Sequence, residues 1–467
     1  MSINMLPDEV LLEIFDFCSL LDVDEWLYAW QTLVHVCRQW RRVVFGSTRR
    51  LNLELVCSTE TPAKDTLNVW PPLPLLVYAD ESKTLGVDNV VAALERSDRV
   101  REISISISRS KSKDLWKAMQ EPVPELIFLD LKSNNEHESL SIPPDSFLGG
   151  FAPSLQSLNF QYVPYPGLPK LLLSTANLTE LSLSIIPPSG YISPEAMATG
   201  FSALTRLESL TLDFKSSRPR PDRQSRRPPP PTRSVLPALT RFKFKGASMY
   251  LDHLVARIDV PRLNDFSIVF FDLLDHDTPH LARFIHRTPY SKAFGKAHIN
   301  FYIDDAVMVN LSSQTFGRGE LNLARLSAMP ERCISYLTQV CTSSLPAIPT
   351  LEDLYIHGDR FQDWQNFIEN HQWLGLLRAF IYVKNLYVSE EFIPSVVSAL
   401  QELVGDQTTE VLPILQNIFL EGPQPSGPIQ EGIQQFVAAR QLTRHPITVS
   451  FRNHIPEKDR YPELFTL

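Results

Sequence analysis

Residues 6–45 read LPDEVLLEIFDFCSLLDVDEWLYAWQTLVHVCRQWRRVVF, and this stretch decides the fold of the N-terminal part of the chain. A helix begins at its start, because Pro7 stands where no N–H donor is needed and the acidic Asp8 and Glu9 suit the positive end of a helix dipole. Apolar side chains follow at the spacing of one apolar face of a helix. They are Val10, Leu11, Ile14, Phe15 and Phe17.

Two further helical runs complete the stretch. The second run carries Trp26, Trp30, Leu33 and Val34, and the third, after Cys37, carries Trp40, Val43 and Val44. Three short helices of this total length fall below the size that folds comfortably alone, since they cannot bury all these side chains on one another. We therefore expect the helices to pack against a partner.

Both ends of the stretch resemble an F-box. The first end is Leu6-Pro7-x-Glu9-Val10-Leu11-x-x-Ile14-Phe15, and the second is Val36-Cys37-Arg38-x-Trp40-Arg41. The segment between them, around Asp22 to Trp26, is longer than the family pattern. The resemblance implies a module that docks a Skp-type adaptor and, through it, a cullin-based (SCF-type) ubiquitin ligase.

The resemblance also implies where the adaptor contacts lie. It places them at the two matched ends, on Leu6, Pro7, Val10, Ile14, Val36, Cys37 and Trp40. The alternative is that the three helices only cap the rest of the chain.

Composition and charge narrow the class of protein. Of 467 residues, 43% are hydrophobic and 21% are charged, which is typical of an ordinary folded chain. The net charge of −9 argues against a dedicated nucleic-acid binder, because phosphate contact needs a basic face. The five cysteines include no CxxC pair, and we expect neither a signal peptide nor a membrane span. These features predict an intracellular protein, in the cytoplasm, the nucleus or both.

A repeated phrase of the form Leu-x-x-Leu-x-Leu organises the residues after the helices. Its copies are Val100-Ile103-Ile105, Leu126-Leu129-Leu131, Leu155-Leu158-Phe160, Leu178-Leu181-Leu183, Leu207-Leu210-Leu212, Leu239-Phe242-Phe244, Leu263-Phe266-Ile268, Leu351-Leu354-Ile356 and Leu415-Ile418-Leu420. Six copies from Leu126 to Leu263 follow one another at 23 to 32 residues, near the length of a leucine-rich repeat. We predict an α/β fold in which a three-helix F-box (residues 1–47) precedes a degenerate leucine-rich-repeat solenoid (residues 48–467).

Strand and helix signals alternate along the predicted solenoid. Alternating apolar residues in 49–55 predict a first strand there. Helix starts are predicted at Ser193-Pro194-Glu195, with Gly200 as the end, and at Thr278-Pro279 and Met329-Pro330. The phrase is lost in residues 302–349, where either the register breaks or a hairpin inserts. The asparagine that bonds the backbone after each strand of a regular repeat is present only at Asn134, so we expect irregular curvature.

Residues 218–233, RPRPDRQSRRPPPPTR, do not fit the repeats. Six arginines and one aspartate give them a charge of +5, and proline is their only apolar residue. We expect a disordered insertion that is dispensable for the fold, because it cannot bury enough surface to offset the entropy of ordering. Alternatives are folding back on an acidic face, binding an acidic partner, a weak nuclear signal, or an SH3-type ligand.

The C-terminal part again alternates strand and helix, with a last strand expected near residues 447–451. Together with WQTLVHVCRQW (30–40), residues 383–442 resemble F-box-like proteins with divergent leucine-rich repeats that are expanded in mushroom-forming fungi. That resemblance implies a substrate receptor and leaves its target open.

The sequence offers no catalytic motif. It has no P-loop, no GxSxG elbow and no HExxH pair. Carboxylates and imidazoles gather at Asp272, Asp275, His276, Asp277, His280 and His286, but this segment reads as a connecting loop. We therefore expect no metal, no cofactor and no enzyme activity.

The target is expected on the strand face of the solenoid, where residues between the leucines point away from the core. The row formed by Arg241, Lys243 and Lys245 differs from the others, because three cations on one strand need balancing acids on the neighbouring strands. The predicted target-binding residues are Asp213, Arg241, Lys243, Lys245 and Asp265, with the repeats around Tyr355 and Tyr387 as the alternative. Two functions remain: a ligase substrate receptor, or a repeat scaffold capped by F-box-like helices with no ligase attached.

Overall fold

The computed structural model describes residues 6–18, 23–47, 51, 53–57, 63–80, 87–135, 137–216, 232–271, 278–288, 294–302, 306–313, 320–326, 330–343, 350–358, 368–403 and 407–452. The chain forms two compact units, Met1–Tyr191 and Ile192–Leu467. Of the expected insertion, residues 218–231 lie outside the described part, whereas Arg233 is described and donates from Nε to the Ala256 carbonyl at 3.3 Å.

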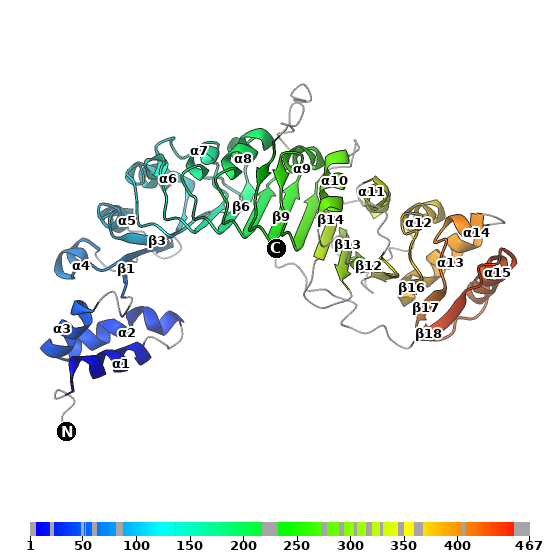
Figure 1. The fold of residues 1–467 in the computed structure, drawn as a ribbon, viewed down its shortest axis with the longest axis horizontal. Coiled ribbons are helices and arrows are strands. Elements are labelled where there is room, and N and C mark those ends of the chain that lie inside the picture. Colours follow the sequence, from blue (N-terminus) through cyan, green and yellow to red (C-terminus); the bar gives the residue numbers. More distant parts are fainter. Residues whose placement is uncertain are drawn as a thin grey trace. The chain divides into compact units, whose positions relative to one another are not determined.

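The first unit opens with the three predicted helices, α1 (Asp8–Cys18), α2 (Val23–Val36) and α3 (Arg38–Gly46) (Figure 1). Their core is apolar and comes from all three helices, since helices this short are stabilised mainly by packing. The buried side chains are Leu11, Leu12, Phe15, Trp30, Val34, Trp40, Val43 and Val44.

Parallel strands follow in chain order. They are β1 (Leu55–Cys57), β2 (Leu75–Asp80), β3 (Val100–Ile107), β4 (Phe128–Ser133), β5 (Ser157–Gln161) and β6 (Glu180–Ile186). The returns contain α4 (Ala63–Val69), α5 (Val87–Leu94), α6 (Arg109–Ala118), α7 (Leu168–Leu172) and the 3-10 turns η2 (Phe147–Gly150) and η3 (Pro188–Gly190). Residues 49, 50 and 52 of the strand expected over 49–55 lie outside the described part. Of the others only Leu55 is in a strand, β1, and the Leu51 N–H bonds the Ser47 carbonyl at 3.0 Å.

The second unit continues the alternation, with helices along one side of its strands (Figure 1). Its strands, in spatial order, are β7 (Ser209–Phe214), β9 (Arg241–Gly246), β11 (Asp265–Phe270), β14 (Glu320–Leu326), β13 (Ala306–Ser313), β12 (Phe294–Phe301), β15 (Asp353–Gly358), β16 (Asn385–Val388), β17 (Asn417–Glu421) and β18 (Thr448–Arg452). All neighbours are parallel except β12–β13 and β13–β14, which are antiparallel. The inserted antiparallel hairpin, rather than a simple break in the repeat register, therefore explains why the Leu-x-x-Leu-x-Leu pattern is missing from residues 302–349.

The helices of the second unit are α8 (Pro194–Phe201), α9 (Ser248–Val255), α10 (Pro279–Arg287), α11 (Pro330–Ser343), α12 (Asn370–Leu377), α13 (Ile393–Gln401), α14 (Gln407–Glu410) and α15 (Pro428–Leu442), with the 3-10 turn η6 (Glu390–Phe392). The predicted starts at Pro194, Pro279 and Pro330 are confirmed, and the Ser193 hydroxyl caps α8 by accepting from the Ala196 N–H. Gly200 does not end α8, because the helix continues to Phe201 and Ser202 caps it.

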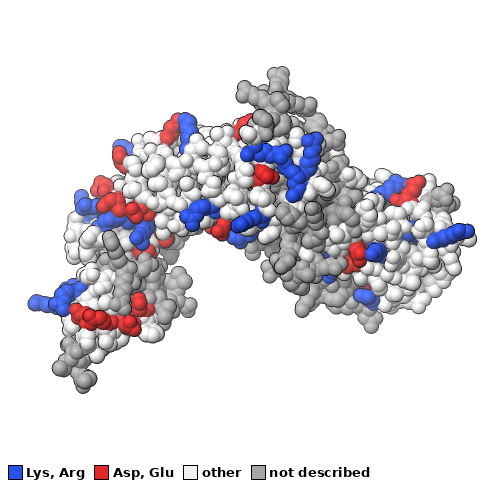
Figure 2. Space-filling model, in the orientation of Figure 1, with Lys and Arg blue, Asp and Glu red and all other residues white. Residues whose placement is uncertain are grey.

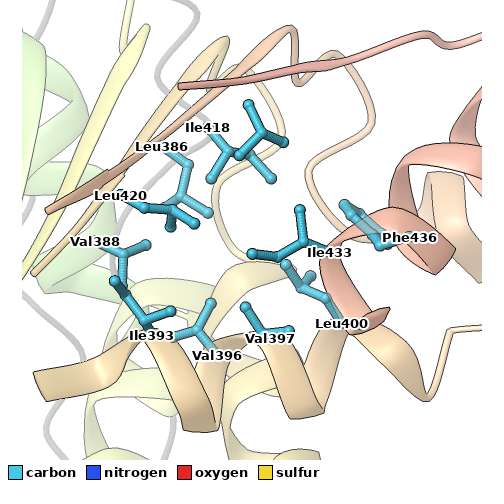
Figure 3. Close-up of a pocket in the computed structure, with 12 residues that line it drawn as sticks. Leu386, Val388, Ile393, Val396, Val397, Leu400, Ile418, Leu420, Ile433 and Phe436 are labelled. Carbon is cyan, nitrogen blue, oxygen red and sulfur yellow. The ribbon is translucent and has the colours of Figure 1, made fainter. Parts of the chain in front are cut away.

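An apolar cavity of about 20 Å³ lies between β16, β17, α13 and α15 (Figure 3). Leu386, Val396 and Phe436 are among the side chains that line it. A cavity of this volume has room for little more than one water molecule, and its apolar walls offer a water no hydrogen bonds. It is a packing void of the last repeats and not a ligand site.

Candidate functional site

Helix α1 carries two apolar faces. Leu11 and Phe15 are buried against the other helices, whereas Val10, Ile14 and Phe17 are 42%, 37% and 71% exposed. The side chains predicted to form one apolar face lie on two sides of the helix, because residues at offsets 0, 4 and 7 share one side and residues at offsets 1 and 5 lie on another. We call Val10, Ile14 and Phe17 the docking stripe.

The junction of α2 and α3 presents a second apolar residue to solvent. Val36, the last residue of α2, is 54% exposed. Cys37 breaks the helix as the N-cap of α3, with its Sγ accepting from the Trp40 N–H at 3.5 Å. The Arg41 guanidinium donates to the Val34 carbonyl at 2.9 Å, which satisfies the end of α2. The local capping chemistry therefore leaves Val36 at a corner of the bundle.

The start of α1 is tied to α3 by polar contacts. Gln39 donates to Asp8 at 3.4 Å, and an Arg42 guanidinium nitrogen lies 3.6 Å from the other Asp8 oxygen. Exposed contacts of this kind contribute little stability, but they hold the start of α1 beside α3. The two sequence ends that resemble an F-box are thus adjacent in space.

The seven predicted adaptor contacts divide into three groups. Pro7, Val10, Ile14 and Val36 are exposed, and Leu6 and Cys37 are half-buried. Trp40 is buried with its ring 4.9 Å from that of Phe15, in an edge-to-face arrangement, so its side chain belongs to the core of the helices. Phe17 is exposed on the same side of α1 as Val10 and Ile14 but was not among the predicted contacts, although its spacing from them already placed it there.

An aromatic cluster joins the helices to the first repeat. Trp30 donates from Nε1 to the Glu54 carbonyl at 3.0 Å, and its ring lies 5.2 Å from that of Trp70, edge to face. Phe45 and His35 complete the cluster at 5.5 and 6.3 Å from Trp70. The repeat is therefore one partner that buries apolar surface of these helices.

The five predicted target-binding residues lie on three neighbouring strands. Asp213 on β7 is directly opposite Lys245 on β9, and Arg241 on β9 is opposite Asp265 on β11. The Lys245 ammonium is 3.7 Å from an Asp213 oxygen. Lys243 lies between these two pairs on β9 and is exposed. We call these five residues the charged stripe.

Burial shapes the charges of this stripe. It raises the pKa of Asp213 to about 6, although the Lys245 charge opposes the shift. It also raises the pKa of Asp265, against the opposing charges of Lys243 and Arg241. At neutral pH Asp213 is mostly ionised, and below about pH 6 it takes up a proton, so the stripe becomes more positive.

This shift predicts a pH dependence of stability. Between pH 7 and pH 5 the folded protein takes up a proton at Asp213 that the unfolded chain, with its ordinary pKa of 3.8, does not, so this group favours folding increasingly as the pH falls. The melting temperature of the parent relative to Asp213→Asn should therefore rise from pH 7 to pH 5. The exposed Asp145→Asn serves as the control. If the difference in melting temperature between the parent and Asp213→Asn is the same at pH 7 and pH 5, the pKa of Asp213 is not raised by folding.

Two side-chain ladders cross the C-terminal strands. Rings stack along one row, with centroids 4.4 Å apart from His298 to Tyr355, 4.2 Å from Tyr355 to Tyr387 and 4.6 Å from Tyr387 to Phe419. Arg452 lies 4.2 Å from the centre of the Phe419 ring and closes the row.

The second ladder is made of hydrogen bonds. Asn385 donates to Asp353 at 2.7 Å, Asn417 donates to Asn385 at 2.8 Å, and the Thr448 hydroxyl donates to Asn417 at 2.6 Å. A short asparagine ladder therefore exists, but at the first residue of each strand rather than at the bend after it. The alternative target site around Tyr355 and Tyr387 coincides with the stacked rings, whose faces are already covered by one another.

One comparison with known proteins identifies the N-terminal module. Residues 3–52 match the F-box domain family. No curated protein matches the chain. Among solved structures the chain is similar to "Crystal structure of Rad7 and Elc1 complex in yeast", with 11% sequence identity, a TM-score of 0.25 and coverage of 89% of this chain and 88% of that one. The assignment of the fold therefore rests on the strand pairing and the F-box match.

The class of protein follows from these observations. This is an α/β protein in which an N-terminal helical F-box domain precedes a solenoid of parallel strands and helices like that of leucine-rich-repeat proteins. The helices that the structure describes include none long and apolar enough to cross a membrane. His, Cys, Asp and Glu side chains of the described residues nowhere group as metal ligands, and residues 272–277 of the acidic and histidine-rich segment lie outside that part.

Proposed function

We propose that this protein is the substrate-recognition subunit of a cullin-based (SCF-type) ubiquitin ligase. One observation carries the proposal: the segment that matches an F-box domain presents an exposed apolar stripe, Val10, Ile14 and Phe17, on the side of α1 that faces away from its own core. Exposed apolar side chains that lie together mark an interaction surface. A Skp-type adaptor is the partner that an F-box implies.

The proposed role is non-catalytic. The F-box holds the adaptor, and through it the cullin, while the repeats hold the target. Linking both partners raises the effective concentration of target lysines near the ligase without any chemistry in this chain. Such a protein would act in the cytoplasm, the nucleus or both.

Assembly tests the proposal directly. Purified chain, Skp-type adaptor and cullin should elute together in size-exclusion chromatography, and omission of the adaptor should release the cullin. A chain that elutes alone from a mixture in which adaptor and cullin associate would contradict the proposal.

We further propose that the charged stripe contacts the target. Its three cations outnumber its two acids, and it lies on the accessible strand face of β7, β9 and β11. Such a surface suits a polar or acidic segment rather than an apolar one.

Charge reversal tests this assignment. Arg241→Glu, Lys243→Glu and Lys245→Glu together should reduce severalfold the proteins that co-purify with the chain–adaptor complex, measured by quantitative mass spectrometry, with adaptor recovery unchanged. The matched control reverses three exposed cations of α6, Arg109, Lys113 and Lys117. Equal recovery from variant and parent would place the target elsewhere.

The second candidate function is a repeat scaffold without a ligase. The aromatic cluster of Trp30, Phe45 and Trp70 favours it, because the helices pack on the first repeat as a cap would. A cap needs no exposed docking stripe, however. Adaptor binding separates the two functions.

A further inference from the structure

A group of arginines gathers beside the short second sheet of the C-terminal unit. Strand β8 (Ser234–Val235) pairs in parallel with β10 (Ile258–Asp259), which puts Arg233, just before β8, beside the residues that precede β10. Helix α10 adds Arg283 and Arg287, which are one turn apart and both exposed. We call Arg233, Arg283 and Arg287 the arginine cluster.

Among the residues that the structure describes, few acids compensate this cluster. Burial and the charges of Arg233 and Arg283 lower the pKa of Arg287, and only Asp259 opposes them. Within the part of the chain that the structure describes, neither Arg283 nor Arg287 forms an ion pair. Figure 2 shows cations gathered around an acid on the surface over α9 and α10. The cluster therefore concentrates positive charge on a chain whose net charge is −9.

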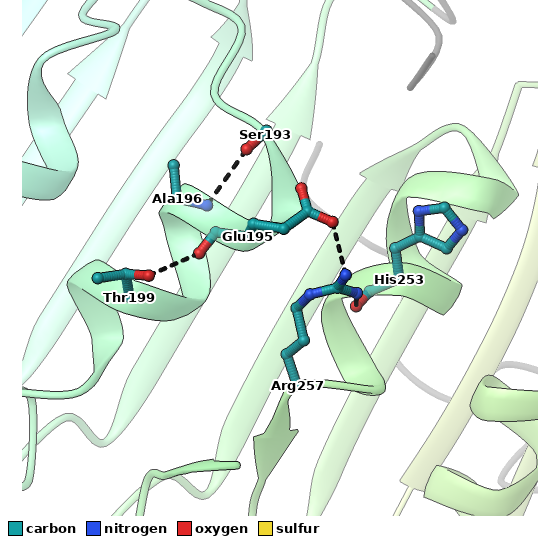
Figure 4. A network of polar contacts seen from close by, with 6 residues as sticks. All are labelled: Ser193, Glu195, Ala196, Thr199, His253 and Arg257. Carbon is teal, nitrogen blue, oxygen red and sulfur yellow. Dashed lines mark hydrogen bonds and ion pairs between the residues drawn. The ribbon is translucent and has the colours of Figure 1, made fainter. Parts of the chain in front are cut away.

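A nearby arginine shows what a structural role looks like. Arg257 is buried, donates to the His253 carbonyl at 2.7 Å, and pairs at 2.7 Å with Glu195 of α8 (Figure 4). This pair ties the end of α9 to α8. Arg283 and Arg287 have no such partner in the described residues, and holding like charges together without one costs free energy. Stability of the fold does not account for their placement.

We propose that the arginine cluster binds a carboxylate-rich segment of a partner protein. Guanidinium groups suit this chemistry, because each can donate two parallel hydrogen bonds to one carboxylate. The inference rests on the proposed function only in taking the target as that partner. It adds a contact on the helix side of the repeats to the charged stripe on the strand side.

Charge favours a short acidic peptide over a nucleic acid. The three arginines and Asp259 carry +2, which leaves −11 on the remainder of the chain. A segment of a few carboxylates can lie within the cluster. A longer phosphate backbone would extend beyond the three arginines, and the rest of the chain carries a net negative charge, which disfavours its binding.

Fluorescence anisotropy with the full chain tests the proposal. The probe is a fluorescein-labelled octapeptide of alternating Glu and Gly, at about 50 mM salt to limit screening. Arg283→Gln with Arg287→Gln should weaken binding at least about tenfold. Arg233 is left intact because its Nε bonds the Ala256 carbonyl. The control, Arg378→Gln with Arg444→Gln, removes the same charge from other repeats, where Arg378 already pairs with Glu410 at 3.7 Å.

Three outcomes would overturn the proposal. The first is that the parent and the Arg283→Gln, Arg287→Gln variant bind the peptide equally well. The second is that the control variant loses as much peptide affinity as the cluster variant. The third is that the cluster binds a single-stranded RNA octamer more tightly than the peptide. Adaptor capture is measured on the same proteins. If the cluster variant loses peptide binding but keeps adaptor capture, the proposal that the cluster binds acidic segments is supported. If the parent fails to capture the adaptor, the proposed ligase role is contradicted, whereas the result for peptide binding still holds.

Discussion

The double substitution Val10→Glu and Ile14→Glu is expected to abolish capture of a Skp-type adaptor while the chain stays folded. Both side chains are exposed, so the core around Leu11 and Phe15 is not disturbed. In a complex, two carboxylates would be buried against an apolar surface without partners, which disfavours association strongly. We expect the affinity to fall at least about 100-fold, equivalent to about 2.7 kcal/mol, by biolayer interferometry with immobilised adaptor.

A matched control separates docking from general charge effects. Val69→Glu with Phe151→Glu replaces two exposed apolar residues of the same unit, outside the F-box helices, and adds the same charge. This variant should bind adaptor like the parent. Unchanged binding by the Val10 and Ile14 variant, with parental helicity by circular dichroism, would move the docking face away from α1.

Arg440→Ala is expected to destabilise the C-terminal repeats by about 2 to 4 kcal/mol, because three carbonyls lose a charged donor inside the protein. The Arg440 side chain is fully buried in α15. It donates to the carbonyls of Thr408 at 2.9 Å, Leu412 at 3.0 Å and Leu415 at 3.3 Å, and so holds the turn before β17.

The effect should be local to the last repeats. Hydrogen exchange of β17 and α15 amides should quicken in Arg440→Ala, while exchange in β3 to β5 stays as in the parent. Arg444→Ala, an exposed arginine one turn later, is the control and should change stability by less than about 0.5 kcal/mol. If these amides exchange in Arg440→Ala at the same rate as in the parent, water replaces the guanidinium without loss of stability.

Burial patterns made most of the fold predictable. Each Leu-x-x-Leu-x-Leu copy became a strand because alternate residues of a strand share a face, and Leu129, Leu131, Leu210 and Leu212 are fully buried as that alternation requires. The helix starts at Pro194 and Pro279 followed from capping chemistry, which is local. The hairpin of β12 to β14 remained an alternative, since pairing between strands depends on contacts that periodicity does not encode.

The sites were predictable only where they are local in sequence. The matched ends of the F-box gave Pro7, Val10, Ile14 and Val36, which are exposed. Apolar character alone could not tell Trp40 of α3, which is buried, from Phe17 of α1, which is exposed. The arginine cluster escaped detection, since Arg233 belongs to β8, which pairs with residues 24 positions further along, whereas Arg283 and Arg287 belong to α10.

Titration of a purified Skp-type adaptor into the full-length chain by isothermal calorimetry tests the central claim most directly. An F-box that presents the docking stripe predicts a one-to-one complex with a Kd of about 1 µM or tighter, and no measurable heat of binding for the Val10→Glu and Ile14→Glu variant. A folded parent chain that binds no adaptor at tens of micromolar would contradict the assignment as a ligase receptor and favour the capped scaffold.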